Sequence, residues 1–371
     1  MAKPFSRRLV LLLGLWSAAA YGAEKPAWQI EWERTVQAAK QEGRVAIYAA
    51  IGPYHPAIFS EFQKDYPEVK VVMVHGSSSQ ISPRLLAERR AGQYLADVYM
   101  GGPTSLYRFH QSKHFDPITP LFMLPEVADQ SKWWEGKHTY IDPERQYIFV
   151  NEGSISGLTI AYNTRLVKAE EFKSYWDILA PKWKGKIVSL DVREPGFGTS
   201  ELRFVYYHPE LGPEFIRRFF SEMGVVLARD HRQTINWVAT EKFALCLFCR
   251  DTFASEARSQ GLPIDSFNPK EMKEMPRLRG SASSLALMNR PAHPNAAKVF
   301  INWFLSRRGQ QVYQEGHGDR DSLREDVPKD KVPPRFRRVP GKKYLFVEEP
   351  AFMDAKPALK IVEEALSERK K

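Results

Sequence analysis

Three predominantly apolar segments, interrupted only by Lys70 and Asp97, recur in the first third of the chain, and amphipathic stretches separate them. The apolar segments are residues 45–50, 69–74 and 96–100, and the stretches at 56–66 and 83–90 carry apolar side chains at helical spacing. Strands made almost entirely of apolar residues are typical of parallel sheets that helices cover on both faces. The order strand, helix, strand, helix, strand therefore predicts an α/β fold.

In open parallel sheets, ligands bind beyond the carboxyl ends of the strands. Ser77 and Ser78 follow the second apolar segment, and Gly101 and Gly102 follow the third. Hydroxyl and backbone N–H groups at a helix start suit a negatively charged ligand, but the same serines can simply cap a helix. Both interpretations stay open for these serines, and we expect Ser82 to cap the helix at 83–90.

The stretch 174–200 combines a short helix, a short strand and a glycine-rich turn. Ser174 can cap a helix at 175–179, and residues 187–190 form an apolar run of strand length. The turn at 195–198 follows, and Thr199 or Ser200 can cap the next helix. A strand that leads through such a turn into a helix offers backbone N–H groups to an anion. Taken alone, the same pattern more often indicates an ordinary loop.

Further strands and helices alternate through the rest of the chain. Residues 158–163, 243–248 and 283–288 have the composition of buried strands, and Asn295 can cap a helix with a strongly apolar face. Other helices are expected at 28–42, 214–223, 233–240, 252–260 and 355–367.

Several short segments together resemble one family. They are Trp176-Asp177, the PKWKGK run at 181–186, the GFGTS turn at 196–200, AERRAG at 87–92, IAYNT at 160–164 and HPNAA at 293–297. In combination they resemble the periplasmic solute-binding proteins of bacterial ABC importers, in particular the receptors for ferric ion, thiamine and phosphorylated solutes. The resemblance covers nearly the whole chain after its first 23 residues and says little about the ligand.

The resemblance implies an α/β fold of two lobes, the type II periplasmic-binding-protein-like fold, with a ligand cleft between the lobes. We expect lobe one to contain residues 24–157 and 284–325, and lobe two residues 158–283 and 326–371. The implied function is to deliver a small anionic or zwitterionic solute to the permease subunits of an ABC transporter. We expect a monomer without cofactor or enzymatic activity, neither inserted in a membrane nor bound to nucleic acid.

Candidate ligand contacts in lobe two lie where strands end. Arg193 leaves the strand at 187–190 just before Gly198, Thr199 and Ser200, where a guanidinium can clamp a carboxylate or phosphate. The favoured alternative for Arg193 is a surface ion pair with Asp191 or Glu194. The same two alternatives hold for Arg250 and Asp251, at the end of the strand at 243–248. Trp237 is expected in the core, with stacking on a ligand as the lesser alternative.

A ferric-ion receptor of the same fold is one alternative function. Ferric-binding relatives carry two adjacent tyrosines just past the strand that residues 243–248 resemble, whereas this chain has Cys249, Arg250 and Asp251 there. Tyr206-Tyr207 lies in a helical region, so we do not assign iron ligation to it. Ferric iron prefers anionic oxygen ligands, so a cationic Arg250 favours an anion or a zwitterion, and we expect no metal ligands.

Two other functions are weighed against the receptor. A periplasmic enzyme is less favoured, because the motifs GxSxG, HExxH, GxxxxGK and GxGxxG are absent from the sequence. A ligand-binding partner of a sensor differs only in the membrane protein that it contacts. Multiple-turnover chemistry would indicate an enzyme, and reversible stoichiometric binding a receptor.

The first 23 residues have the pattern of a signal peptide. Lys3, Arg7 and Arg8 precede an apolar run at 9–20, and small residues follow at 20–23. The sequence thus predicts export to the periplasm. Removal of these residues lowers the formal net charge from +10 to 10 − 3 = +7. A basic run at 335–343 is expected on the solvated surface. No nucleic-acid-binding motif accompanies it.

Cys246 and Cys249 form the only CxxC pattern in the chain. Two thiols cannot complete a four-ligand zinc site, and no paired histidines are nearby. On a strand, residues three apart point to opposite faces. The pattern therefore favours two buried thiols, with a local disulfide as the alternative.

Overall fold

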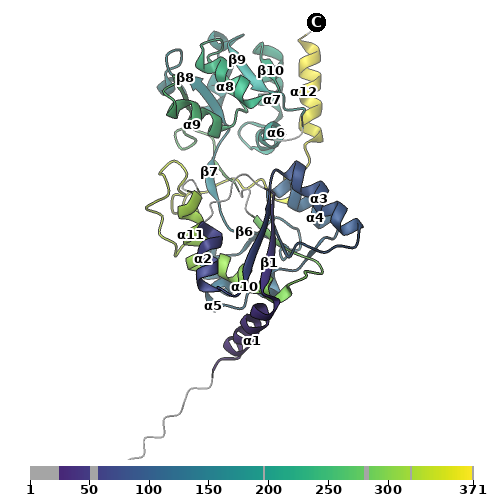
Figure 1. Cartoon of the computed structure of the whole chain (residues 1–371). Helices are drawn as coiled ribbons and strands as arrows, with labels where there is room; N and C mark the ends of the chain where they lie inside the picture. The colour runs from purple at the N-terminus through teal and green to yellow at the C-terminus, as the bar shows by residue number, and fades with distance from the viewer. Residues whose placement is uncertain (1–24, 51–56, 195–196, 280–283, 318–319, 370–371) are drawn as a thin grey trace, which may run out of the picture.

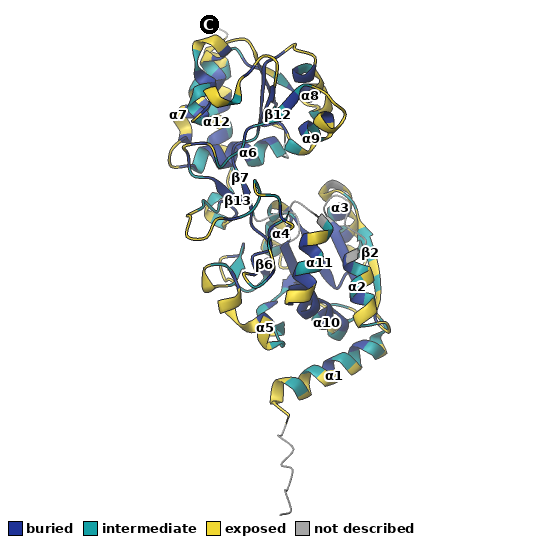
Figure 2. Ribbon diagram, turned by 90° about the vertical axis from the view of Figure 1, so that its left-hand side faces the viewer, coloured by how far each residue is buried: buried dark blue, intermediate teal, exposed yellow. Residues whose placement is uncertain are grey.

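The computed structural model describes residues 25–50, 57–194, 197–279, 284–317 and 320–369. Two lobes, each with its own sheet and helices, lie one above the other and meet at a narrow waist that contains β7 (Ser154–Ser156) (Figure 1). The buried strands run through the middle of each lobe (Figure 2). The segment 1–23 with its proposed cleavage zone, and Pro195-Gly196 of the glycine-rich turn, lie outside the described residues.

Lobe one is built on a sheet with the order β2-β1-β3-β14-β6-β5, in which β4 also pairs with β14. β2, β1 and β3 are parallel, as the sequence predicts, and β14 returns from lobe two antiparallel to β3 and β6. The strands are β1 (Arg44–Ala50), β2 (Lys70–His75), β3 (Val98–Gly101), β4 (Phe115–Asp116), β5 (Thr139–Tyr140), β6 (Ile148–Val150) and β14 (Ser284–Met288).

Helices cover both faces of this sheet, with α2, α10 and α11 on one side and α3 and α4 on the other (Figure 1). α1 packs along α10, whose side chains are almost all buried. The helices are α1 (Ala27–Glu42), α2 (Ala57–Asp65), α3 (Ser78–Arg90), α4 (Pro103–Gln111), α5 (Pro125–Ala128), α10 (Pro294–Leu305) and α11 (Arg307–His317). The sequence did not predict α4 or α11.

Three predictions for lobe one are wrong in detail. α3 begins at Ser78 rather than at Pro83, because Ser77 and Gln80 form a capping box in which the Ser77 backbone N–H donates to Gln80 Oε1 over 2.9 Å. Pro83 lies inside the helix. β2 is an edge strand rather than a buried one, so its apolar side chains are only partly covered and Val72 is 40% exposed. The α10 helix likewise starts at Pro294, with His293 rather than Asn295 before it.

Lobe two is a second α/β sandwich, with sheet order β10-β9-β11-β8-β12. β10, β9 and β11 are parallel, and β8 runs antiparallel to β11. Because successive strand residues face opposite sides, Ile187 belongs to the core beneath α6, α7 and α12, and Val188 to the core beneath α8 and α9. The strands are β8 (Ile160–Asn163), β9 (Ile187–Leu190), β10 (Val226–Ala228), β11 (Leu245–Leu247) and β12 (Ile264–Ser266). The helices are α6 (Phe197–Tyr207), α7 (Gly212–Glu222), α8 (His231–Ala239), α9 (Asp251–Ser259) and α12 (Lys356–Glu368).

The turn after β9 is shorter than the sequence predicts, because α6 already begins at Phe197. Gly198, Thr199 and Ser200 therefore form the first helical turn instead of a loop with a hydroxyl cap. Thr199 Oγ1 donates to the carbonyl oxygens of Val192 (2.9 Å) and Glu194 (2.8 Å) and ties the helix start to the strand exit. A Cβ atom at position 198 would lie 3.4 Å from Val192 Cα, so glycine lets the two segments approach closely.

The waist contains β7 paired antiparallel with β13 (Arg277–Arg279), and the C-terminal segment runs beside them. The N–H of Ile155 donates to Phe336 O (3.0 Å), and the N–H of Leu278 donates to Leu345 O (2.9 Å). α12 packs on α7, whereas Arg338 and Lys329 bond to Asp321, which follows α11. The division between lobes at residues 325 and 326 stays a prediction.

The two cysteines form a disulfide, so the favoured prediction of two separate thiols is wrong. β11 ends at Leu247, and Phe248 adopts a left-handed backbone (φ 58°). The chain therefore turns before Cys249, and the Cα atoms of Cys246 and Cys249 lie 5.8 Å apart, within the usual range for a disulfide. Strand geometry does not apply to Cys249, because it lies beyond the strand end.

Candidate solute site between the lobes

A cavity of about 420 Å³ lies at the waist, and we name it the interlobe cavity. Its wall combines β7 and the chain that leads from it into β8, the first residues of α6 and α9, β12 with the following loop, and parts of β13 and the C-terminal segment. The basic residues of the wall are Arg250, Arg258, Arg279, Arg320 and Arg335; the acidic residues are Asp251 and Asp265; the aromatic residues are Phe197, Phe267 and Phe336.

The carboxyl ends of two parallel strands deliver part of this wall. β9 leads through residues 191–194 to α6, whose first residue is Phe197, and β11 leads through the disulfide turn to Arg250, the residue before α9. The sequence predicts ligand contacts at these strand ends because parallel sheets open there. The waist supplies the rest, since Ser154, Ser156 and Arg279 lie on the paired strands β7 and β13.

Most of the arginines in the wall are paired with carboxylates. Arg258 bonds to Asp265, and Arg335 lies 3.7 Å from Asp251. Arg320 lies 3.7 Å from Glu152, a buried residue just before β7. These pairs hold the arginines in place and neutralise much of their charge.

Glu201 of α6 lies behind the wall and is fully buried. Its carboxylate pairs with Arg277 and with Arg279, whose Nη2 lies 2.5 Å from Glu201 Oε1, and Thr159 Oγ1 donates to Oε2 over 3.1 Å. Burial alone would raise the pKa of Glu201, but the two guanidinium groups outweigh it and the pKa lies below its usual value. Glu201 is therefore a carboxylate that orients Arg279 toward the cavity.

Arg250 differs from the other arginines of the wall. In the described part of the chain its guanidinium has no hydrogen bond or ion pair, and it stacks on Phe197 with the guanidinium carbon 4.7 Å from the ring centre. Arg279 approaches the same ring at 5.3 Å. Desolvation lowers the pKa of Arg250, but a guanidinium stays charged in proteins. The cavity thus holds one exposed, unneutralised cation fixed on an aromatic ring.

Two of the eleven residues nominated from the sequence line the cavity, namely Arg250 and Asp251. Arg193 instead forms the alternative ion pair: its Nε and Nη2 each donate to the Asp191 carboxylate over 2.7 Å, and its side chain is 44% exposed. Trp237, expected in the core, is partly buried and packs against it, with its ring 5.8 Å from that of Phe243. The other nine nominated residues do not line the cavity: they are Ser77, Ser78, Gly101, Gly102, Arg193, Gly198, Thr199, Ser200 and Trp237.

The sequence missed Phe197, Arg279 and Arg335 as parts of one wall. Arg335 belongs to the basic run at 335–343, which the sequence places on the solvated surface, and Arg338 of that run is in fact buried against Asp321. The prediction of a solvated run assumes that its basic residues have no buried acidic partner. Asp321, which precedes the run in the sequence, was an indication of such a partner. The spatial union of Phe197 with Arg279 has no signal in a single sequence.

A cluster of three possible metal ligands lies in lobe one, away from the interlobe cavity. His110, Asp142 and Glu144 lie close enough to share an ion in the described part of the chain. The Asp142 carboxylate, however, already accepts the backbone N–H groups of Gln146 (2.8 Å), Tyr147 (3.1 Å) and Ile148 (2.7 Å), which explains its burial as a turn cap. Tyr206 and Tyr207 lie at the end of α6 and do not line the interlobe cavity.

The model of the bacterial extracellular solute-binding protein family matches residues 48–311. This match spans well over half of the chain, so the chain belongs to that family, and its two-lobed fold is confirmed as a periplasmic-binding-protein fold. The protein is therefore an extracellular solute receptor. No helix among the described residues has the length and apolar character needed to cross a membrane. No curated protein sequence matches the chain.

Solved structures with this fold include three binding proteins. Iron-bound HitA from Pseudomonas aeruginosa is 16% identical, with 87% of this chain and 99% of that chain covered and a TM-score of 0.57. AfuA from Actinobacillus pleuropneumoniae, with fructose-6-phosphate bound, is 16% identical over 88% and 99%, with a TM-score of 0.59. PotD of the spermidine/putrescine ABC transporter from Streptococcus pneumoniae is 13% identical over 88% and 99%, with a TM-score of 0.62. At these identities the likeness shows the shared fold.

Proposed function

We propose that this protein is the periplasmic receptor of an ABC importer for a small solute with a carboxylate or phosphate group. The observation that carries the proposal is Arg250, an unneutralised guanidinium held over Phe197 in the interlobe cavity. A guanidinium offers two parallel N–H donors to a carboxylate or phosphate, and such charge-assisted bonds are among the strongest in proteins. Asp251 and Asp265, also in the wall, leave room for a zwitterionic solute.

Lobe closure would complete the site. The wall includes residues of lobe two and of the waist, so a solute there contacts segments that move relative to one another when the lobes rotate. A closed form that satisfies the solute from both sides is favoured by the difference in affinity between the two forms. We propose residues 1–23 as the export signal, a monomeric receptor without enzymatic activity, and permease subunits as its partners.

A ferric-ion receptor fits the wall less well. Iron-bound HitA shares the fold, but the wall of the interlobe cavity contains five arginines, two carboxylates and neither tyrosine nor histidine among the described residues. Ferric iron prefers several anionic oxygen ligands. Five guanidinium groups around such an ion would oppose its binding, whereas an anion would be attracted.

A ligand screen by thermal shift tests the proposal, because a solute that binds the folded protein raises its melting temperature. The panel contains inorganic phosphate, citrate, a sugar phosphate, thiamine, spermidine and ferric citrate, tested on the chain from residue 24. We expect the largest shifts from anions, and a dissociation constant measured by calorimetry for the best of them. Stabilisation by spermidine or thiamine alone would contradict the proposal, and turnover of a bound compound would indicate an enzyme.

A further inference from the structure

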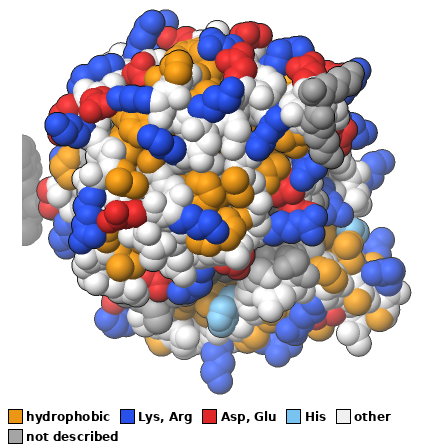
Figure 3. Space-filling view, turned by 90° about the horizontal axis from the view of Figure 1, so that it is seen from above, with side chains coloured by type: hydrophobic (Ala, Val, Ile, Leu, Met, Phe, Trp, Pro, Cys, Tyr) orange, Lys and Arg blue, Asp and Glu red, His pale blue; other side chains and the backbone are white. Residues whose placement is uncertain are grey.

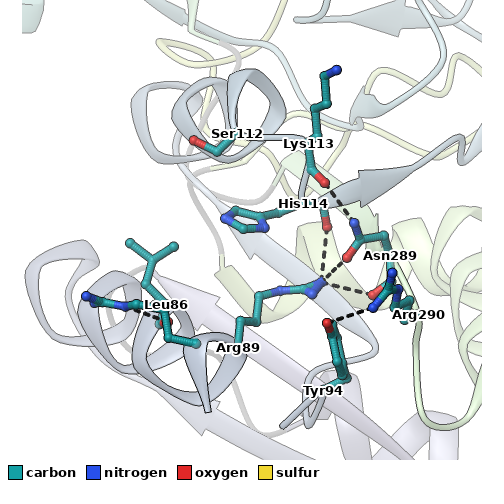
Figure 4. Close-up of a pocket in the computed structure, with 9 residues that line it drawn as sticks. Leu86, Arg89, Tyr94, Ser112, Lys113, His114, Asn289 and Arg290 are labelled. Carbon is teal, nitrogen blue, oxygen red and sulfur yellow. Dashed lines mark hydrogen bonds between the residues drawn. The ribbon is translucent and has the colours of Figure 1, made fainter. Parts of the chain in front are cut away.

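A second cavity, of about 590 Å³, opens on lobe one, and we name it the lobe-one cavity (Figure 4). The end of α3, the turn after α4 and the turn after β14 form its wall. β14 starts at the waist with Ser284, so the turn after Met288 lies at the other end of the sheet from the interlobe cavity. Its basic residues are Arg89, Arg90, Lys113 and Arg290, and no carboxylate belongs to the part of its wall that the structure describes.

Two arginines of this cavity are held by neutral groups. Arg89 Nη2 donates to the backbone oxygen of Asn289 over 2.9 Å and also to its side-chain amide oxygen. Arg290 Nη1 donates to Tyr94 Oη over 2.9 Å. The Tyr94 ring centre lies 5.0 Å from the guanidinium carbon of Arg89 and 5.3 Å from that of Arg290. Figure 4 shows both side chains reaching the same tyrosine from different segments.

The charges of these arginines are not neutralised by their partners. Carbonyl and phenol groups fix a guanidinium without cancelling its charge, and no carboxylate pairs with Arg89 or Arg290 among the described residues. Burial is the main cause that lowers the pKa of Arg89; Arg290 lowers it further as a like charge, whereas Tyr94 and Asp116 act in the opposite direction without reversing the shift. Each guanidinium has N–H groups that make none of these bonds, and these groups can donate to an acceptor that carries negative charge.

Two residues of the wall also adopt a costly backbone conformation. Lys113 (φ 56°) and Arg290 (φ 52°) are left-handed, a conformation that glycine adopts without strain. Lys113 follows α4, and four other helices are likewise followed by a left-handed residue that is glycine, namely Gly43, Gly92, Gly224 and Gly261. The helix α8 ends with left-handed Glu241, so strain alone does not define a site. Here, however, both strained residues belong to the wall of one cavity.

We propose that the lobe-one cavity binds a small anion with two or more negative charges, such as a polycarboxylate or pyrophosphate, at a site separate from the solute site. Its volume is within the range of small-molecule sites in proteins. An anion between Arg89 and Arg290 would relieve their repulsion and use their remaining donors. His114, whose pKa is lowered by burial and by Arg89, stays neutral near pH 7 and adds a donor without charge repulsion.

Calorimetric titration with inorganic pyrophosphate at low ionic strength tests this proposal on wild type, Arg290→Gly and Arg145→Gly. Arg145 is also left-handed (φ 55°) and exposed but lies outside the cavity, so the control makes the same backbone change. We expect Arg290→Gly to weaken pyrophosphate binding about 10-fold or more, since one charged hydrogen bond is lost, and Arg145→Gly to leave it unchanged. Neither variant should lower the melting temperature, because glycine relieves strain at both positions.

The pyrophosphate binding that Arg290→Gly weakens should persist in Arg250→Ala, because this variant changes the interlobe cavity alone. Equal pyrophosphate affinities of the two glycine variants would overturn the proposal, and so would loss of the event in Arg250→Ala. A third contrary result is reduced solute uptake by Arg290→Gly with unchanged pyrophosphate affinity. That result would make this face a docking surface for an acidic protein partner instead.

Discussion

The two cavities use arginine in opposite ways. Around the interlobe cavity, Arg277 and Arg279 share Glu201, Arg258 pairs with Asp265, and Arg250 alone is without an acidic partner in the described residues. In the lobe-one cavity, carbonyl and phenol groups hold Arg89 and Arg290. An arginine paired with a carboxylate is well ordered but has little charge left for a ligand, whereas one held by neutral groups keeps its charge.

Charge on the outer surface shows a third arrangement. On the end face of lobe two, basic and acidic side chains lie interspersed among apolar ones (Figure 3). Such exposed pairs are screened by solvent and contribute little to stability or to recognition. The arginines therefore differ in their surroundings, which are a carboxylate, a neutral group or solvent, and substitutions in each kind of surroundings should have different effects.

The largest expected effect is on folding, at the buried carboxylate. Glu201→Gln keeps the shape of the side chain but leaves Arg277, which is 1% exposed, without its charge partner. Breaking a buried pair in this way costs about 3–5 kcal/mol. We expect a loss of about 3 kcal/mol in the free energy of unfolding in urea. Asp265→Asn, at the partly exposed pair with Arg258, should cost less than about 1 kcal/mol. Similar losses of unfolding free energy in Glu201→Gln and Asp265→Asn would show that the buried pair contributes no more to stability than the partly exposed pair.

The second effect is on binding, at the unpaired arginine. Once the ligand screen supplies an anion, Arg250→Ala should weaken its binding by about 2 kcal/mol, or roughly 30-fold, through loss of a charged hydrogen bond. The melting temperature without ligand should barely change, because no described carboxylate depends on Arg250. Calorimetry and thermal melts on the same samples measure both quantities. A variant that keeps full affinity, or that melts early, would assign Arg250 to structure.

Features that depend on local sequence signals could be predicted best. Strand β9 was predicted at its observed bounds, because an apolar run is a local signal. Arg250 and Asp251 were nominated at a strand end either as ligand contacts or as ion-pair partners, and both line the interlobe cavity. The start of α3 was missed because Pro83 is a stronger local signal for a helix start than Ser77, although the Ser77–Gln80 capping box decides it.

The wall of the interlobe cavity lay beyond prediction for a different reason. Phe197, Arg279 and Arg335 come from segments more than fifty residues apart and meet only through the pairing of β7, β13 and the C-terminal segment. No spacing rule connects such positions. The choice between a ligand clamp and an ion pair for Arg193 likewise depended on the direction of its side chain, and the structure shows the pair with Asp191.

A smaller effect is expected on the pH dependence of folding, at His208. Guanidinium groups stay charged between pH 5 and 8, so pH dependence of folding in that range must come from other residues. His208 is buried; its Nε2 donates to Met275 O over 2.9 Å, its Nδ1 accepts the N–H of Glu210, and burial lowers its pKa. The unfolded chain then takes up a proton more readily than the folded one. The stability that neutral His208 provides is complete above about pH 6.5 and is lost as pH falls through its folded pKa.

Urea unfolding of wild type and His208→Gln at several pH values from 8 to 5 measures this contribution. We expect the wild type to lose stability by up to about 1.4 kcal/mol per pH unit from this group below pH 6.5, and His208→Gln to show a shallower decline. His138 of lobe one, whose pKa is also lowered by burial, provides a second acid-sensitive group. An identical pH slope in wild type and His208→Gln would show that His208 is not neutral in the folded protein.

The smallest effect is expected at Arg193, which the sequence suggested as a possible clamp for the ligand. Its guanidinium makes two 2.7 Å bonds to Asp191, it is 44% exposed, and it does not line the interlobe cavity. The pair lowers the pKa of Asp191. Solvent screening keeps the stability contribution of such a pair below about 1 kcal/mol. Arg193→Ala should therefore change anion affinity by less than about 2-fold, well under one charged hydrogen bond. Calorimetry measures the anion affinity of Arg193→Ala and Arg250→Ala under the same conditions. The two variants are comparable because each removes one guanidinium from the end of a parallel strand. A 30-fold weakening by Arg193→Ala would mean that Arg193 leaves Asp191 when the lobes close and clamps the solute, and that pairing with a carboxylate does not withdraw an arginine from ligand binding.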